Sequence, residues 1–198
     1  MGRCGGGGGH GRQLLLLAVL ACSWVAPAEA QPQRAAPRTD PVEAAALNAI
    51  LRRWRTTPPT TWNISGEPCS GTAVDETDIN IIDFGIKCDC SFNNGTVCRI
   101  VRLKVYRLDV VGQIPEELQN LTHLIHLNLG MNYLTGSLPA FIGELTALQY
   151  LSLGVNALTG VLPRELGNLK NLTSLSISTN KFVGPLPEVL ENLTKLEQ

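Results

Sequence analysis

The fold is decided by residues 127–148, LNLGMNYLTGSLPAFIGELTAL, because they recur almost unchanged as residues 151–172, LSLGVNALTGVLPRELGNLKNL. Four copies of this unit fill residues 101–196, each 24 residues after the last. The repeated positions include four glycines and four prolines: Gly112, Gly136, Gly160 and Gly184, and Pro115, Pro139, Pro163 and Pro187. A period this strict predicts a solenoid of stacked coils.

Each unit begins with a pattern that is typical of a short strand. Leu127 and Leu129 alternate with His126 and Asn128, the period of a strand with one buried face. An asparagine then closes the strand in three of the four units: Asn132, Asn156 and Asn180. Because its amide both donates and accepts, we expect this column to bond the loop backbones of neighbouring coils. In the first unit Leu108 stands at that place, so we expect its pairing to be looser or to be supplied by the segment that precedes it.

The segment after the asparagine reads LTGSLP at 134–139 and LTGVLP at 158–163. It resembles the plant-specific class of leucine-rich repeat. The resemblance implies an α/β solenoid of about four repeats, with parallel strands on the concave side and irregular or 3₁₀ segments on the convex side. We expect repeats at 101–124, 125–148, 149–172 and 173–196, behind a helical, disulfide-linked cap at 31–100.

Residues 1–30 have the pattern of a secretory signal peptide. Arg3 and Arg12 supply positive charge, residues 14–25 form a short apolar run, and AEA at 28–30 is a small-x-small cleavage site. The sequence therefore predicts cleavage before Gln31 and a secreted or cell-surface location; an uncleaved membrane anchor is the alternative. The formal net charge of the chain is −1, which argues against a nucleic-acid partner.

Four cysteines remain after that cleavage: Cys69, Cys88, Cys90 and Cys98. In an exported chain an even number predicts disulfides. Cys88 and Cys90 are too close in sequence to bridge each other well. Two connectivities stay open, Cys69–Cys88 with Cys90–Cys98, which we favour, or Cys69–Cys90 with Cys88–Cys98. Zinc is disfavoured because the repeated C-x-x-C spacing is missing.

A helix is predicted between the leader and the cysteines. Asp40 is placed to cap it, Pro41 takes its first position and Glu43 completes a capping box. Its apolar residues fall on one face: Val42, Ala46, Leu47, Ile50, Leu51 and Trp54. A solenoid needs its end leucines covered, and we expect the helix, Trp62 and the cysteine-linked loop to cover them. The acidic run at 75–83 is interpreted as a solvated loop because its spacing does not match a calcium loop.

Motifs of this cap narrow the family. TDPVE at 39–43, WNISGEPCSG at 62–71, IKCDCS at 86–91 and LKVY at 103–106 resemble the N-terminal part of plant leucine-rich repeat receptor-like serine/threonine kinases. In the subgroup most similar, a malectin-like domain, a membrane span and a cytoplasmic kinase follow the repeats. The sequence given reaches Gln198 without such segments, so we expect no kinase activity and no cofactor in this polypeptide.

The candidate binding face consists of strand-region residues that point away from the leucines. They grade from basic and aromatic to small and hydroxylic: Arg102, Lys104, Tyr106, His126, Asn128, Met131, Tyr150, Ser152, Val155, Ser174 and Ser176. Tyr106 and Tyr150 are the expected anchors. The basic residues of the first strand, Arg99, Arg102, Lys104 and Arg107, fit a solvated face better than a site for an acidic ligand. His123 and His126 are expected to diverge, so no metal site is predicted.

Five N-x-S/T sequons predict glycosylation at Asn63, Asn94, Asn120, Asn171 and Asn192. With the leader, they indicate an extracellular recognition module that binds a peptide, a glycan fragment or another ectodomain and has no chemistry of its own. The alternative is a self-standing secreted decoy or inhibitor, similar to leucine-rich repeat proteins that block cell-wall-degrading enzymes.

Overall fold

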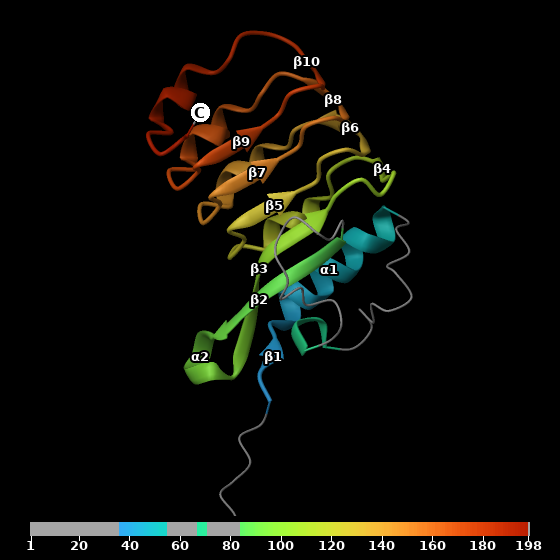
Figure 1. Ribbon diagram of the computed structural model, residues 1–198, viewed down its shortest axis with the longest axis vertical. Helices are drawn as coiled ribbons and strands as arrows, with labels where there is room; N and C mark the ends of the chain where they lie inside the picture. The colour runs from blue at the N-terminus through green and yellow to red at the C-terminus, as the bar shows by residue number, and fades with distance from the viewer. Residues whose placement is uncertain (1–35, 55–66, 71–83, 198) are drawn as a thin grey trace, which may run out of the picture. The chain divides into compact units, whose positions relative to one another are not determined.

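The structure is a computed structural model that describes residues 36–54, 67–70 and 84–197. The predicted leader, Trp62, Asn63 and the acidic run lie outside the described residues. Within them, the predicted solenoid is confirmed: successive coils stack along one axis, from the green β3 to the red C-terminal coil (Figure 1).

The concave side of the solenoid is one sheet. Strands β3 (Val97–Val105), β5 (His126–Asn128), β7 (Tyr150–Ser152) and β9 (Ser174–Ser176) pair in parallel, and each is displaced by one repeat from the last. Two strands from the cap extend the sheet: β1 (Arg38–Thr39) pairs in parallel with β3, and β2 (Phe84–Ser91) pairs with it in antiparallel fashion. The short turn between β2 and β3, Phe92–Gly95 (α2), has left-handed backbone at Asn93 and Asn94.

The convex side consists of one 3₁₀ turn per coil, as predicted. These turns are η2 (Glu116–Asn120), η3 (Ala140–Glu144), η4 (Arg164–Asn168) and η5 (Glu188–Asn192). Each begins directly after the repeated proline, which lacks an N–H and fits the start of a helical turn. The turns stack closely: a Cβ built on Gly143 would lie 2.1 Å from the backbone oxygen of Glu165 on the next coil. Glycine is therefore required there.

A second parallel sheet, absent from the sequence prediction, runs along the flank. It consists of β4 (Val111–Gly112), β6 (Tyr133–Ser137), β8 (Ala157–Gly160) and β10 (Lys181–Phe182), in that spatial order. Two of its strands, β6 and β8, contain the L-T-G segment of the repeat. Tyr133 points to solvent from it, with 59% of its surface exposed.

The core between the sheets and the 3₁₀ turns is a ladder of leucines. Leu103, Leu127 and Leu151 pair across neighbouring strands and are fully buried, as are Leu129 and Leu153 one step along. Burying such a side chain contributes about 1.5–3 kcal/mol. The repeated aliphatic positions therefore hold the coils together.

The asparagine column bonds neighbouring coils as expected. The Asn132 amide donates to the carbonyl oxygens of Val105 (2.8 Å) on the coil before and Leu129 (3.0 Å) on its own. Its Oδ1 accepts from the N–H groups of Leu108 and Val110, both at 3.1 Å. Asn156 and Asn180 repeat the arrangement one and two coils later. The first coil, which lacks its own asparagine, is thus bonded by that of the second.

Helix α1 (Pro41–Arg53) is capped as predicted, since Asp40 Oδ1 accepts from the N–H of Val42 (2.9 Å) and Glu43 (3.2 Å). The predicted capping box is wrong. A capping box needs the Asp40 N–H to donate to the Glu43 carboxylate. That N–H donates instead to the Cys98 carbonyl of β3 (2.9 Å), so the bond to Glu43 does not form. The assignment of Val42 to the packed face is also wrong, because 57% of its surface is exposed.

Glu43 has a different place, at the junction of cap and repeats. Its carboxylate is fully buried, and Oε2 accepts from the Ile100 N–H of β3 at 2.6 Å. Oε1 lies 3.3 Å from both Arg99 and the Nδ1 of His123. At the other end of the helix the Trp54 indole donates to the Gln113 carbonyl at 2.9 Å. Helix α1 is therefore fastened to the first coil at both ends.

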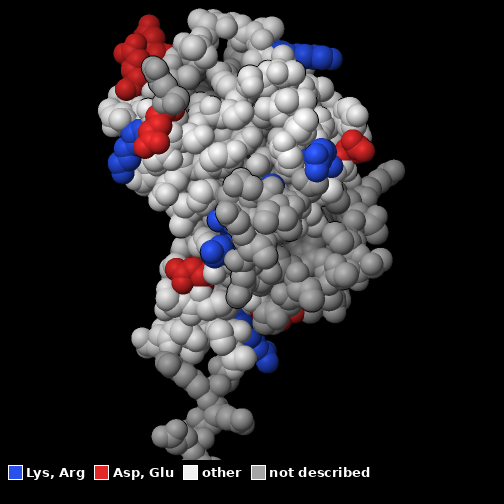
Figure 2. All heavy atoms as spheres, viewed as in Figure 1, with Lys and Arg blue, Asp and Glu red and all other residues white. Residues whose placement is uncertain are grey.

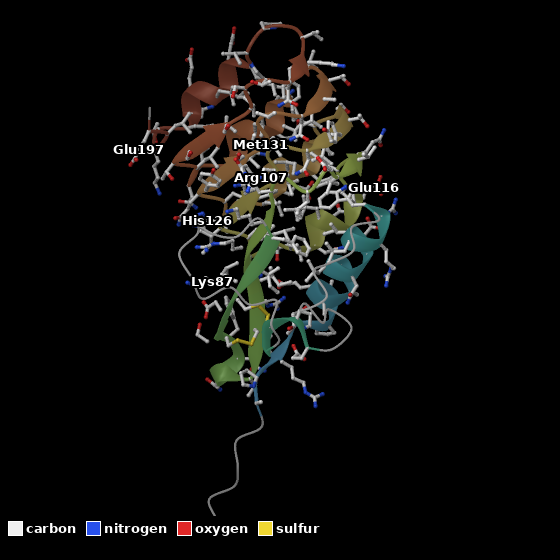
Figure 3. The ribbon with its side chains drawn as sticks, turned by 45° about the vertical axis from the view of Figure 1, so that its right-hand side comes forward. Lys87, Arg107, Glu116, His126, Met131 and Glu197 are labelled. Atoms are coloured by element: carbon white, nitrogen blue, oxygen red, sulfur yellow. A yellow bond between two sulfur atoms is a disulfide. The ribbon has the colours of Figure 1, made fainter. Side chains whose placement is uncertain are left out.

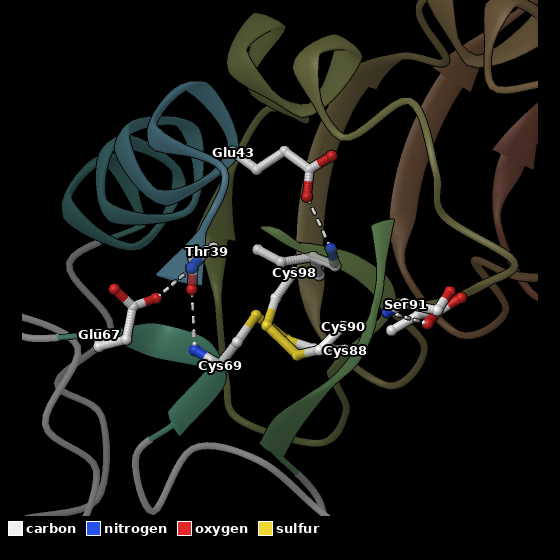
Figure 4. The surroundings of a disulfide bond; sticks show 10 residues. Thr39, Glu43, Glu67, Cys69, Cys88, Cys90, Ser91 and Cys98 are labelled. Atoms are coloured by element: carbon white, nitrogen blue, oxygen red, sulfur yellow. Dashed lines mark hydrogen bonds between the residues drawn. A yellow bond between two sulfur atoms is a disulfide. The ribbon is translucent and has the colours of Figure 1, made fainter. Parts of the chain in front are cut away.

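The structure joins Cys69 to Cys88 and Cys90 to Cys98, the first of the two connectivities that the sequence left open. Figure 4 shows the two bridges beside β1 and the short turn η1 (Pro68–Ser70). The Cys69 N–H donates to Thr39 Oγ1 at 3.0 Å, and the Thr39 N–H donates to the Glu67 carboxylate. The bridges and these bonds tie η1 and β1 to the β2–β3 hairpin.

Candidate recognition groove on the concave sheet

The register of the concave sheet arranges the outward side chains in two rows. Arg102, His126, Tyr150 and Ser174 face one another across β3, β5, β7 and β9. The second row, two residues further along each strand, is Lys104, Asn128, Ser152 and Ser176. Neighbours in a row are about 4.8 Å apart, the separation of paired strands. The face is therefore continuous over four coils.

The second row and the turns after it enclose a shallow groove of about 430 Å³. Eight of the eleven predicted binding residues line it: Lys104, Tyr106, Asn128, Met131, Tyr150, Ser152, Val155 and Ser176. The other three, Arg102, His126 and Ser174, belong to the first row and are not part of its lining. Ser178, which the sequence also places on this face, lines the groove, as do Gly130 and Gly154, which the sequence prediction did not count as binding residues.

The two glycines keep the floor of the groove low. A Cβ on Gly154 would lie 2.8 Å from Ser176 Oγ, and one on Gly130 would lie 3.2 Å from the Gly154 carbonyl oxygen. A larger residue would need both the neighbouring coil and the groove floor to shift. The signal in the sequence was the glycine that stands two places before the repeated asparagine in the two middle units.

Tyr106 closes the groove at the end nearest the cap. Its hydroxyl donates to the Met131 sulfur at 2.8 Å, and Lys104 Nζ lies 5.4 Å from its ring centre. The Arg107 guanidinium lies 6.0 Å from the same ring. Two cations on one ring stabilise its position through cation–π attraction, so Tyr106 is held in place before any ligand arrives.

The rim of the groove carries apolar side chains in an unusual backbone conformation. Met131 and Val155 are 41% and 43% exposed and have φ of 54° and 58°. The equivalent residues of the first and last coils, Arg107 and Thr179, share this conformation. Left-handed backbone is costly for a β-branched residue such as Val155. The turn before each asparagine imposes this left-handed conformation, which directs the side chains of Met131 and Val155 to the edge of the groove.

The basic residues of β3 have different surroundings, contrary to a single solvated face. Arg99 pairs with Asp40 (3.0 Å) and Glu43 (3.3 Å) and belongs to the cap. Lys104 and Arg107 pack on Tyr106, while Arg102 stands in the first row beside His126. Among the described residues on the face shown in Figure 2, lysines and arginines are scattered among uncharged and acidic side chains.

The two histidines that the sequence brought to notice lie in separate environments. His123 contacts Glu43 and packs edge-on against Phe92, with ring centres 5.0 Å apart. His126 faces Tyr150, with ring centres 5.8 Å apart. Burial lowers the pKa of His126, and the positive charges of Arg102 and Lys87 lower it further. Within the described ranges, no group of three or more His, Cys, Asp or Glu residues is placed to hold a metal ion.

Four of the predicted glycosylation sites lie on exposed positions outside the groove lining. Asn120 and Asn192 end the 3₁₀ turns η2 and η5, and Asn94 lies in the turn between β2 and β3. Asn171 donates to the Thr146 carbonyl (3.2 Å) and accepts from Lys195 (2.8 Å). Glycosylation of all four stays a prediction. No helix in the part of the chain that the structure describes has the length and apolar character of a membrane span.

The chain belongs to the leucine-rich repeat proteins, since the family model described as "Leucine-rich repeat region" matches residues 79–198, more than half of its length. Two probable leucine-rich repeat receptor-like serine/threonine-protein kinases of Arabidopsis thaliana are 52% and 50% identical to it over 92 residues. Those matches cover 43% of this chain and 9% of each relative. The chain thus corresponds to about a tenth of these relatives, and no catalytic domain is evident among its described residues.

Solved structures place the fold among plant receptor ectodomains. The ectodomain of the receptor kinase SOBIR1 from Arabidopsis thaliana matches with a TM-score of 0.63 and 26% identity, over 82% of this chain and 79% of that one. The ectodomain of GASSHO1/SCHENGEN3 from the same plant, in complex with CASPARIAN STRIP INTEGRITY FACTOR 2, matches with a TM-score of 0.61 and 32% identity. That match covers 78% of this chain and 17% of that ectodomain.

Proposed function

We propose that residues 31–198 are the N-terminal part of the ectodomain of a receptor-like serine/threonine kinase and that the concave groove binds its extracellular ligand. The observation that carries the proposal is the groove itself. It is preformed, with a tyrosine at each of two coils, glycines and serines in its floor and apolar side chains on its rim. Such a mixture of rigid aromatic anchors and small hydroxyl groups suits recognition of a ligand by contact, without chemistry.

Three further facts support this reading. Two relatives that match 43% of the chain at 52% and 50% identity are probable receptor-like kinases. The two disulfides agree with an oxidising, extracellular compartment, which the predicted leader would supply. The resemblance of the cap motifs to the subgroup with a malectin-like domain extends the proposal to that subgroup. The ligand classes are a peptide, a glycan fragment or a second ectodomain.

The groove is tested with secreted residues 31–198 on an array of plant cell-wall oligosaccharides and secreted peptides. Tyr106→Ala and Tyr150→Ala each remove an aromatic anchor and should lower the affinity for every ligand that the wild-type protein binds on the array by about tenfold or more. Tyr133→Ala is the matched control, because it removes the same aromatic side chain from an exposed position on the flank sheet, outside the groove. Equal binding by all four proteins, or a loss confined to Tyr133→Ala, would refute the groove as the ligand site.

A further inference from the structure

A row of basic side chains crosses the concave sheet beside the groove, at the junction of cap and repeats. Lys87 of β2 pairs with Arg102 of β3, and Arg102 pairs with His126 of β5. Ile86, Leu103 and Leu127, which precede or follow them on the same strands, are fully buried in the core. Because strand residues alternate between faces, Lys87, Arg102 and His126 all project from the concave face. Figure 3 shows Lys87 and His126 on the same side of the ribbon.

Two nitrogens in this row are buried without a hydrogen-bond partner: Arg102 Nε and His126 Nδ1. Buried polar nitrogens are satisfied in the great majority of cases, and an orphaned one is destabilising. Here two lie on neighbouring strands in one row. Each nitrogen belongs to a side chain that is itself partly exposed, so an acceptor from outside the chain reaches it once that side chain rotates outward.

The charges around the row point in the same direction. Two carboxylates of the cap, those of Asp40 and Glu43, pair with Arg99, which is not a member of this row. Among the described residues no carboxylate forms an ion pair with Lys87 or Arg102. The groups that face His126 are Lys87 from β2, Arg102 from β3 and the uncharged Tyr150 from β7. The row therefore holds like charges together, and an anion would relieve their repulsion.

We infer that Lys87, Arg102 and His126 form an oxyanion site that binds a carboxylate or sulfate group of the ligand. The inference rests on the proposed function of the groove. Arg102 offers a planar fork of N–H donors that matches the two oxygens of such a group, and Lys87 adds a mobile point charge. Tyr150 is the next member of the same row, so a ligand lying across the strands would place its anionic end on β2, β3 and β5. Its uncharged part would lie over Tyr150 and the serines beyond. The oxyanion can come from an acidic sugar or from an acidic or sulfated peptide.

The site is tested on secreted residues 31–198 by NMR titration of His126, with sulfate, trigalacturonate and triglutamate as separate probes. Bound oxyanion favours the protonated imidazole, so the pKa of His126 should rise by about one unit or more at saturation. Arg102→Gln should weaken binding by about tenfold or more, and Lys87→Gln by a smaller factor. Arg164→Gln and Lys181→Gln are the matched controls, because they remove the same charges from exposed positions away from the row. Lys87 is exposed, so Lys87→Gln keeps the test valid if Arg102→Gln does not fold.

The results separate the inference from its alternatives. An unchanged pKa of His126 with all three probes, or equal losses in Arg102→Gln and Arg164→Gln, would overturn the oxyanion site. Binding of trigalacturonate alone, or of triglutamate alone, supports the site and identifies the acidic sugar or the acidic peptide as its source. Sulfate binding that persists while the tyrosine variants leave the array unchanged would refute the groove and keep the site. Ligand binding in the groove without any change in the pKa of His126 would refute the oxyanion site and keep the groove.

Discussion

The asparagine column gives the sharpest test of how the coils are held together. Asn132 is 5% exposed and makes hydrogen bonds to the backbones of two coils. In Asn132→Ala the N–H groups of Leu108 and Val110 lose their common acceptor, Oδ1. A buried group left without a partner costs about 1–3 kcal/mol, so two of them should lower the free energy of unfolding by about 2–6 kcal/mol.

The same substitution two coils later provides an internal scale. Asn180 Oδ1 accepts from one backbone N–H, that of Leu158, in a partly exposed setting. Asn180→Ala should therefore cost about 1–3 kcal/mol, toward the lower end. Asn168→Ala, on the exposed end of η4, should change stability by less than about 0.5 kcal/mol.

Urea unfolding followed by circular dichroism, with the disulfides intact, measures all three variants. The predicted order of destabilisation is Asn132→Ala, then Asn180→Ala, then Asn168→Ala. If Asn132→Ala lost no more stability than Asn180→Ala, the column would not be the main bond between the first two coils. The account of the first coil, which has Leu108 in place of an asparagine, would then be refuted.

Three further predictions concern the spacing of coils, the cap and pH. Gly143→Ala places a Cβ 2.1 Å from the Glu165 carbonyl oxygen and should lower the free energy of unfolding in urea by about 1–3 kcal/mol or more. Ala140→Gly on the same turn should lower it by less. Equal effects of the two variants would argue against close stacking of the turns. Glu43→Ala leaves the buried Ile100 N–H without an acceptor and should lower the free energy of unfolding by about 3–5 kcal/mol. Glu43→Gln keeps an acceptor and should lower it by less. The reverse order would show that the charge of Glu43 matters more than this hydrogen bond. The pKa of His126 is lowered in the folded protein, so the unfolded chain binds that proton more readily and stability should fall as pH drops below about 6.5. A pH series of urea midpoints should be flatter in His126→Gln than in the wild type, and an identical slope would contradict the burial of this imidazole.

Much of the solenoid follows from the sequence because its causes repeat. Leu127 and Leu151 recur at one spacing, so a single burial pattern, once recognised, predicts the concave sheet and its register. The asparagine column was predictable for the same reason, since Asn132 and its equivalents have only backbone groups within reach. The flank sheet was missed because its strands are two to five residues long, and two of them, β6 and β8, include Thr-Gly steps that are equally typical of turns.

Features that depend on packing between distant segments were not predictable. Glu43 resembles a capping-box residue, but the docking of α1 on β3 gives its carboxylate the Ile100 N–H as donor. The same docking takes Arg99 into ion pairs and separates it from Arg102. Lys87 enters the candidate oxyanion site only because β2 runs antiparallel to β3, with a register shift directly after Lys87. A repeat pattern carries no information about these contacts, because the cap occurs once.

The claim that the chain receives ligands for a receptor kinase is tested most directly in the tissue that makes it. An antibody against residues 31–98 would immunoprecipitate the protein from deglycosylated soluble and membrane fractions. Its size would be read from a gel, and its peptides would be identified by mass spectrometry. The account predicts a membrane-bound species far larger than 21.3 kDa whose peptides include a serine/threonine kinase domain. A soluble species slightly smaller than 21.3 kDa, with no kinase peptides in the membrane fraction, would contradict it and favour a secreted decoy or inhibitor.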